Sequence, residues 1–368
     1  MKNYIGKRYS TMAQVYFASA RTYHASDALY KAIPKLFEKV CNIEKNEKVA
    51  IKLHMGELGN TNYIRPIFIK KIVEMVEKEG GMPFVTDTTA LYGGKRGNAI
   101  DYLHTAAING FSISSMNAPV IIADGLLGFD GKGIDINGNK IEIALAILQA
   151  DKLIVASHFK GHGMAGFGGA IKNLGMGCST KNGKIWQHEV SKPVYDSKNC
   201  ILCKKCVDFC PANAIKVDDK VIIDYAACFG CGACTVLCDQ GCFYLPAEKA
   251  EEFQERVAIA AKAAVNNVKG VAYFNFVMNV TPRCDCCSFA DTPIVQDVGI
   301  LASNDPVAID KASFDLVNAL PGMPNSLGEG IEKGIDKFYK IHGIDGTVQL
   351  RKAEEIGLGS MEYKIIEI

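Results

Sequence analysis

The chain of 368 residues has room for one large domain with a small one, or for two domains of medium size. Its 41 Lys and Arg residues against 40 Asp and Glu residues give a formal net charge of +1, so no overall electric field draws it to nucleic acid or to a membrane. Because no apolar run approaches the roughly 20 residues that span a bilayer, and the N-terminal segment lacks the apolar stretch of a secretory signal, we expect a cytoplasmic protein.

Strands and helices alternate along the first half of the chain. Strands are predicted at 14–17, 48–53, 83–86, 119–123 and 152–156, and helices at 27–40, 63–78, 99–108 and 142–149. The pattern breaks near Lys192 and resumes near Ala247, with helices at 250–265 and 307–320 and strands at 271–277 and 299–302. This alternation predicts an α/β fold with a mainly parallel sheet and helices on both of its faces.

A small cysteine-rich α+β unit is expected to interrupt the α/β domain. Residues 191–246 form the predicted insert, and 1–190 together with 247–368 form the discontinuous large domain. The alternative has two α/β domains on either side of a cysteine-rich linker, but the C-terminal part has few strands for a sheet of its own. The residues before Met12 stand as an extension of the fold or as a misassigned start.

Eight of the 14 cysteines lie in two copies of one motif. Cys200, Cys203, Cys206 and Cys210 precede Pro211 with the spacing C-x2-C-x2-C-x3-C-P, and Cys228, Cys231, Cys234 and Cys238 repeat it, with Asp239 in place of the proline. This spacing is typical of bacterial ferredoxins with two [4Fe–4S] clusters, in which the fourth cysteine of each motif ligates the other cluster. The predicted ligand sets are therefore Cys200, Cys203 and Cys206 with Cys238, and Cys228, Cys231 and Cys234 with Cys210.

Zinc is the alternative metal for paired cysteines, but two full copies with a three-residue step do not fit a zinc site well. A β-hairpin with strands at 214–217 and 221–224 is predicted between the two motifs. Four protein ligands on each cluster leave no open iron, so the unit is expected to carry electrons rather than to bind substrate. Cys242 is surplus to the motifs and is interpreted as an idle thiol, and Cys41 and Cys178 follow no pattern.

Polar side chains follow four of the predicted strands, at the edge where ligands bind in open α/β sheets. His54, Asp87, Asp124 and His158 each stand near the carboxyl end of a different strand, so we expect one shared crevice. In an extended segment His158, Lys160 and His162 would point the same way. Together with His54 they are the candidate catalytic residues, able to bind a metal, hold an anion or move protons. The alternative is that the histidines only terminate strands.

Two further patterns surround this crevice. The run 161–166 matches G-x-G-x-x-G but lacks the acidic strand end that a dinucleotide site needs, so it is interpreted as a glycine-rich anion-binding loop at a helix N-terminus. Cys284, Cys286 and Cys287 lie within four residues, and they could ligate a metal or an additional cluster, form a redox pair, or play a structural role. Asp305 is predicted to cap the helix at 307–320.

The strings KLHMGELGNTNYIRP, SHFKGHGMAGFGGAIKNLGMG, TPRCDCC and DVGILASNDPVAIDKAS flank the dicluster insert. With this insert they resemble the family catalogued as domain of unknown function 362, from about Met12 to about Asn318. The resemblance implies a cytoplasmic iron–sulfur protein of prokaryotes, often anaerobes, without a settled reaction. The α/β domain is also similar to that of the nickel-pincer lactate racemase superfamily. The cofactor-attachment motif of that enzyme has no residue-by-residue match here, so its chemistry is not carried over.

These patterns favour an oxidoreductase that relays electrons through two [4Fe–4S] clusters to the α/β domain. The acceptor is expected to be an anionic small-molecule substrate, or an additional metal or redox cofactor, in the crevice lined by His54, His158, Lys160 and His162. A redox protein is then the electron partner, and no nucleic acid or membrane is involved. One alternative is a non-catalytic ferredoxin-like carrier or maturation partner. Another is a metal-dependent isomerase or lyase in which the clusters are structural.

Overall fold

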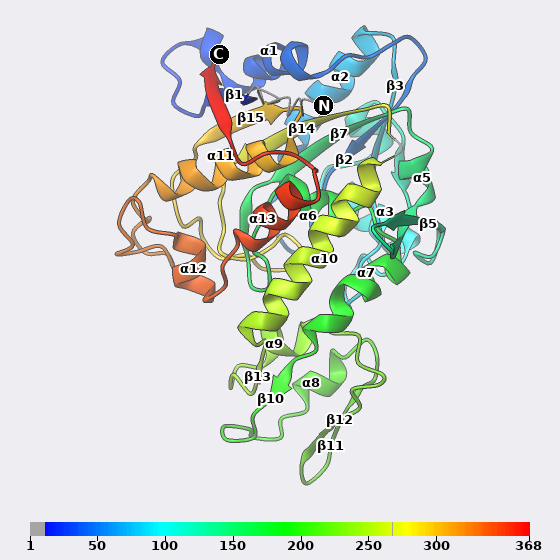
Figure 1. Ribbon diagram of the computed structural model, residues 1–368, viewed down its shortest axis with the longest axis vertical. Coiled ribbons are helices and arrows are strands. Elements are labelled where there is room, and N and C mark those ends of the chain that lie inside the picture. Colours follow the sequence, from blue (N-terminus) through cyan, green and yellow to red (C-terminus); the bar gives the residue numbers. More distant parts are fainter. Residues whose placement is uncertain (1–11, 267) are drawn as a thin grey trace, which may run out of the picture.

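The computed structural model describes residues 12–266 and 268–368, arranged around one eight-stranded sheet (Figure 1). In the order β16-β1-β15-β14-β7-β2-β3-β4, the strands are Tyr363–Glu367, Ala13–Ser19, Gly299–Ser303, Gly270–Val277, Lys152–His158, Lys48–Lys52, Met82–Asp87 and Val120–Ile122. Neighbours from β14 to β4 run parallel, as do β1 and β16, whereas β15 runs antiparallel to β1 and β14. The predicted α/β fold with a mainly parallel sheet is thus confirmed, and the segment before Met12 lies outside the described residues.

Helices cover both faces of this sheet, because successive side chains of a strand point to opposite sides. In the central strand β7, Leu153 and Val155 belong to the apolar core beneath α6, α10, α11 and α13. Ile154 and Ala156 belong to the core beneath α1, α2, α3 and α4. On the first face these helices are α6 (Ala170–Gly175), α10 (Ala247–Val265), α11 (Pro306–Asn318) and α13 (Val348–Glu355), and on the second α1 (Leu29–Val40), α2 (Pro66–Lys78), α3 (Ala99–Ile108) and α4 (Ile113–Met116).

One predicted helix is wrong. A helix was expected over 142–149, but Glu142–Ala144 end strand β6 (Asn139–Ala144), which pairs with β5 (Gly131–Ile136), and only α5 (Leu145–Leu148) is helical. Asn137 and Gly138 both have positive φ, 51° and 83°, as the tightest hairpin turns require. The alternating burial of Ile141 and Ile143 has the period of a strand.

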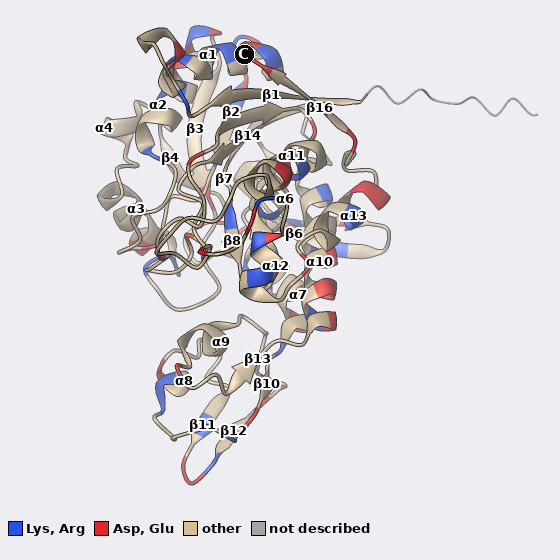
Figure 2. Cartoon of the chain, turned by 90° about the vertical axis from the view of Figure 1, so that its left-hand side faces the viewer, with Lys and Arg blue, Asp and Glu red and all other residues tan. Residues whose placement is uncertain are grey.

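The cysteine-rich segment begins and ends with paired strands. β10 (Val194–Tyr195) runs antiparallel to β13 (Phe243–Tyr244), so both ends of the segment meet. Between them lie α8 (Lys205–Asp208), α9 (Ala233–Leu237) and the predicted hairpin, formed by β11 (Ile215–Val217) and β12 (Val221–Ile223). Figure 2 shows these elements as a small unit below the large sheet. The boundaries at 191 and 246 stay a prediction.

The remaining elements surround the carboxyl edge of the sheet or its ends. They are η1 (Ala25–Asp27), β8 (Lys160–His162), β9 (Gly166–Gly168), α7 (Lys181–His188), η2 (Glu189–Ser191) and α12 (Lys337–His342). Asp305 caps α11 as predicted, since its Oδ1 accepts hydrogen bonds from the amides of Val307 and Ala308, both at 2.9 Å. None of the described helices is long and apolar enough to cross a membrane.

Candidate active site and cysteine sets

A cavity of about 900 Å³ lies between the carboxyl ends of the central strands and the cysteine-rich unit. From the strand side it is lined by all four candidate catalytic residues, His54, His158, Lys160 and His162. The loop after β14 adds Cys284, Cys286 and Cys287, and the cysteine-rich unit adds Cys210 and Cys231. The structure therefore gathers the predicted site residues of three separate segments at one cavity. Asp124 is not among them, because it is buried and accepts hydrogen bonds from Thr89.

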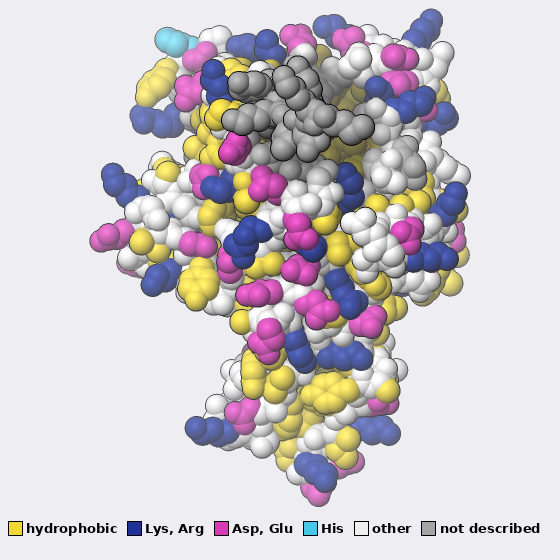
Figure 3. Space-filling model, viewed as in Figure 1, with side chains coloured by type: hydrophobic (Ala, Val, Ile, Leu, Met, Phe, Trp, Pro, Cys, Tyr) yellow, Lys and Arg dark blue, Asp and Glu magenta, His cyan; other side chains and the backbone are white. Residues whose placement is uncertain are grey.

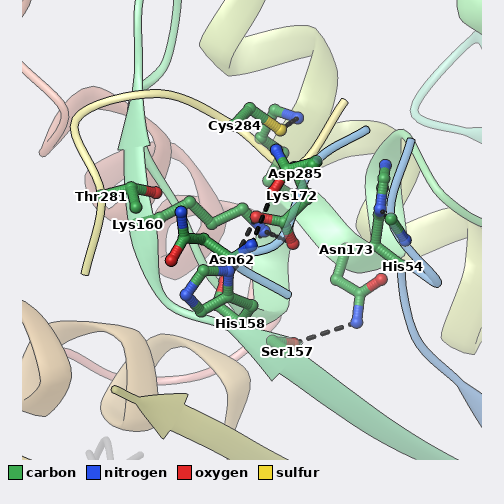
Figure 4. Close-up of polar contacts among 12 residues, drawn as sticks. His54, Asn62, Ser157, His158, Lys160, Lys172, Asn173, Thr281, Cys284 and Asp285 are labelled. Atoms are coloured by element: carbon green, nitrogen blue, oxygen red, sulfur yellow. Dashed lines mark hydrogen bonds and ion pairs between the residues drawn. The ribbon is translucent and has the colours of Figure 1, made fainter. Parts of the chain in front are cut away.

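A buried carboxylate holds the strand residues below the cavity in place (Figure 4). Asp285 is fully buried, and its Oδ1 lies 2.7 Å from His158 Nδ1. Among the residues that the structure describes, His158 Nε2 faces only the carbonyl oxygens of Met278 and Asn279, at 2.9 and 3.0 Å, so this nitrogen donates as well. The ring thus has no nitrogen left for a ligand. His158 is a positioning residue in this arrangement rather than one that touches substrate.

Lys160 completes the same buried group. Its ammonium donates to the His158 carbonyl oxygen at 2.9 Å and lies 3.3 Å from Asp285 Oδ2. Burial alone would raise the pKa of Asp285, but the charges of His158 and Lys160 lower it well below its usual value. Asp285 is therefore a carboxylate that fixes the loop carrying the three thiols to the end of β7.

His54 and His162 have a different role, because each uses Nδ1 to accept backbone hydrogen bonds. His54 Nδ1 accepts from Gly56 at 3.0 Å, and His162 Nδ1 accepts from Met164 and Ala165, both at 3.1 Å. The ring proton then sits on Nε2. Burial, together with nearby positive charge, lowers the pKa of both rings well below the ordinary value, so both are uncharged near neutral pH. His54 Nε2 is buried and has no hydrogen-bond partner among the described residues, which makes it a donor available to a ligand.

The cavity wall also carries positive charge. Lys52 and Arg96 are buried in ion pairs with Asp87 at 2.8 Å and Glu57 at 3.0 Å. Lys172 is half-buried and has no carboxylate within 4.0 Å among the described residues, and its ammonium lies 4.0 Å from Cys284 Sγ. Neither Lys172 nor Asp285 belongs to the sequence-predicted site. The available signal for Lys172 was its place directly after the glycine-rich run, at the start of a helix.

The run 161–166, predicted to be an anion-binding loop at a helix N-terminus, instead forms the β8–β9 hairpin, and the following helix begins at Ala170. The backbone amides of Ala170 and Ile171 at the start of α6 donate to the carboxylate of Asp310, at 2.7 and 2.9 Å. A Cβ atom on Gly169 would lie 2.2 Å from Asp310 Oδ1, which explains the glycine. The helix N-terminus is therefore occupied by the protein's own carboxylate and is closed to an external anion.

The eight motif cysteines fall into two groups in space. Cys200, Cys203, Cys206 and Cys238 line a second, small cavity, and we call them the distal set. Cys228, Cys231, Cys234 and Cys210 are neighbours of one another, and two of them line the large cavity, so we call them the proximal set. This exchange of the fourth cysteine between the motifs fits the crossed ligation of two cubanes. Cys242 is buried next to Cys238.

The loop that bears the three thiols packs closely against β8 at Gly161, and a substitution there can measure this packing. A Cβ atom there would lie 2.3 Å from the carbonyl oxygen of Pro282, and the Gly161 amide donates to Thr281 at 2.8 Å. We expect Gly161→Ala to lower the free energy of unfolding by about 1–3 kcal/mol, because backbone must move to admit the methyl group. Gly163→Ala is the matched control, since nothing lies within 4 Å of its added Cβ. Equal urea midpoints for the two variants would contradict the packing described.

A protein-family match covers most of the chain. Residues 49–315 match the family described as Domain of unknown function (DUF362). A stretch of 42 residues is 50% identical to a subunit of the ion-translocating oxidoreductase complex of Methanosarcina acetivorans, covering 11% of this chain and 16% of that protein. A stretch of 64 residues is 38% identical to the pyruvate synthase subunit PorD of Methanocaldococcus jannaschii, covering 17% of this chain and 73% of that protein. The chain thus spans less than a fifth of the length of the first relative.

Two solved structures are similar at low identity. A Thermotoga maritima protein solved as a structural-genomics target aligns with a TM-score of 0.37 and 8% identity, over 68% of this chain and 50% of that one. The lactate racemase apoprotein from Thermoanaerobacterium thermosaccharolyticum aligns with a TM-score of 0.41 and 10% identity, over 97% of this chain and 83% of that one.

Proposed function

The chain belongs to the family described as Domain of unknown function (DUF362), and from this premise we propose that it is an iron–sulfur oxidoreductase acting on an anionic substrate. The distal and proximal sets would each hold a [4Fe–4S] cluster, which when bound supplies one-electron transfer. One observation carries the proposal: a single cavity is lined by Cys210 and Cys231 at one side and by His54 and Lys172 at the other. Short similarities to proteins of an oxidoreductase complex and of pyruvate synthase support it.

The spacing of the motif cysteines supports clusters over zinc. A tetrahedral zinc ion, with bonds of about 2.3 Å, draws thiolate sulfurs to within about 4 Å of one another. Among the described residues, the group of three metal-ligating side chains whose ligand atoms lie within 4.8 Å of one another contains none of the eight motif cysteines. No three of the motif cysteines therefore meet this limit, unlike the ligands of a single tetrahedral zinc ion.

The positions of the distal and proximal sets would define a direction of electron transfer through the cysteine-rich unit. The distal set lies away from the large cavity, its Cys203 is exposed, and the neighbouring Ile201 and Leu202 are 65% and 37% exposed. Apolar side chains also gather on the surface of this end of the molecule (Figure 3). We infer that a redox protein docks here and donates electrons, and that the proximal set delivers them to the cavity.

In the cavity, the chain's own residues would bind and orient the substrate. Within the part of the chain that the structure describes, Lys172 offers a positive charge without a carboxylate partner, and His54 Nε2 offers a buried donor without an acceptor. A carboxylate or similar anion on the substrate would satisfy the first, and a neighbouring oxygen the second. His158 and Lys160 would act indirectly, by holding the loop that contains Asp285.

The experiment that tests this function follows reoxidation of the reduced protein. Protein reduced anaerobically and freed of excess reductant is mixed with carboxylate-bearing organic acceptors, and the return of visible cluster absorption is measured. We expect Lys172→Met to raise the half-saturating acceptor concentration about 10- to 100-fold, because a charge-assisted hydrogen bond contributes about 1.5–3 kcal/mol. Lys333→Met, at an exposed position, is the control.

Either of two outcomes would count against the proposal. Equal half-saturation in both lysine variants would remove Lys172 as the anchor for the anion. Reoxidation by a redox protein, with no response to any small acceptor, would favour the non-catalytic carrier instead. The exposed residues near the distal set give that second function its support.

A further inference from the structure

We propose that Cys284, Cys286 and His162 bind one thiophilic divalent metal ion of the zinc type at the wall of the large cavity. The ligand atoms of these three residues lie within 4.8 Å of one another, although they come from strand β8 and from the separate loop after β14. Two thiolates and one imidazole form the protein ligand set of an open catalytic zinc site, in which the fourth position is left to water or substrate. Because none of the eight motif cysteines takes part, the site is independent of the proposed electron relay.

The loop that bears the thiols is fixed from three sides, as a metal site requires. Asp285, between the two cysteines, is anchored from below by His158 and Lys160. The carbonyl oxygen of Pro282 accepts a hydrogen bond from His342 Nε2 at 2.7 Å, and that of Thr281 accepts one from Gly161 at 2.8 Å. A tight turn follows, in which the backbone amide of Cys287 donates a hydrogen bond to the carbonyl oxygen of Cys284 at 3.1 Å. The two sulfurs are therefore held in place before any ion binds.

The close spacing favours one ion over a further cluster. A four-iron core stands between its thiolates and keeps them further apart than a single ion does. Charge also suits a divalent ion, because two thiolates supply two negative charges, whereas the charge of buried Asp285 is already paired with His158 and Lys160. The ammonium group of Lys172 lies 4.0 Å from Cys284 Sγ and adds one positive charge beside the thiolates. All three proposed ligands line the cavity, so a bound ion would have an open position toward a ligand there.

Metal binding requires a structural rearrangement at His162 that it does not require at the two cysteines. Its Nδ1 accepts hydrogen bonds from the amides of Met164 and Ala165, so the ring proton sits on Nε2. Coordination through Nε2 moves that proton to Nδ1, and the turn that contains Gly163 must then open. No such rearrangement is needed at the thiols. We therefore assign the two thiolates as the primary ligands and His162 as the third ligand, which contributes less to affinity.

The test uses the anaerobically purified protein with its clusters in place. A mild chelator removes any mononuclear metal, Co²⁺ is added, and unbound ion is removed by gel filtration. We expect one Co²⁺ per chain, with thiolate-to-cobalt charge-transfer absorption in the difference spectrum. Cys284→Ser and Cys286→Ser should each weaken Co²⁺ binding by more than tenfold, and His162→Ala by a smaller factor. Cys287→Ser, the adjacent thiol, should bind Co²⁺ as the unsubstituted protein does.

Iron content and far-UV circular dichroism, measured on every variant, separate loss of this site from loss of the clusters or of the fold. The proposal is overturned if the unsubstituted protein with full iron retains no Co²⁺, or if Cys284→Ser and Cys286→Ser retain as much as Cys287→Ser. It is also overturned if either substitution removes about four iron atoms, which would reveal a third cluster. Peptide mapping that finds Cys284 and Cys286 joined in a disulfide in the anaerobic protein would replace the metal site with a redox pair.

Discussion

Replacing Asp285 with alanine is expected to lower the free energy of unfolding by about 3–5 kcal/mol, because the change leaves two buried positive charges without their partner. His158 and Lys160 are 3% and 8% exposed, and Asp285 is fully buried. Each cation meets the carboxylate directly, at 2.7 and 3.3 Å. Water cannot replace this partner without opening the end of β7, so the desolvation cost of both cations would fall on the folded state.

The pH dependence of this loss has a definite sign. The pKa of Asp285 is lower in the folded protein than in the unfolded chain, where it is about 3.9. The contribution of the Asp285 carboxylate to the free energy of unfolding is therefore complete above about pH 4. It is lost only as pH falls toward the pKa of Asp285 in the folded protein. The titration of the Asp285 carboxylate itself therefore adds no pH dependence to the deficit of Asp285→Ala between pH 6 and pH 8.

Urea midpoints followed by far-UV circular dichroism, at matched iron content, measure this effect. Asp151→Asn is the control, because Asp151 pairs with Lys48 and Lys269 at the surface and should change the midpoint little. Asp285→Asn keeps an oxygen acceptor for His158 but removes the charge, so it should fall between the two. A loss below about 1 kcal/mol for Asp285→Ala would mean that the two cations find other partners or reach water.

The side chains at the carboxyl edge of the sheet could be predicted from the sequence, whereas the ion pairs that they form there could not. The strands that end near His54 and His158 have clear apolar runs, and parallel strands place such ends together. Asp285 lies 127 residues from His158, and no local pattern links them. The sequence pattern around Asp285 pointed only to the three cysteines, although a buried histidine at a strand end needs an acceptor.

Two errors in the predicted elements have different physical origins. The glycine-rich run 161–166 forms the β8–β9 hairpin rather than a helix N-terminus, and at the start of α6 the backbone amides donate to Asp310, 140 residues away in α11. The isoleucines at 141, 143 and 147 fit helical spacing and strand alternation alike, and the turn at Asn137 and Gly138 decides for the strand. A residue far along the chain therefore determined the first outcome, whereas the Asn-Gly turn that determined the second lies directly before the strand in the sequence.

The crossed cysteine sets predict a large and specific loss of iron in paired substitutions. If the fourth cysteines exchange, Cys210 and Cys231 ligate the same cluster, and Cys210→Ala combined with Cys231→Ala should leave about four of about eight iron atoms per chain. Cys210→Ala combined with Cys203→Ala should damage both clusters and leave almost none. Without exchange the two results would be reversed, because Cys210 and Cys203 would then share a cluster.

Anaerobic iron and sulfide analysis measures both double variants against the unsubstituted protein. Cys242→Ser is the matched control, because this buried cysteine lies beside Cys238 but is outside both sets, and it should keep about eight iron atoms. Zinc in place of iron in the unsubstituted protein would rule out the clusters altogether. The pair that keeps four iron atoms also tests the direction of the relay: with only the distal set intact, the protein should still accept electrons but should deliver them to a cavity-bound acceptor far more slowly.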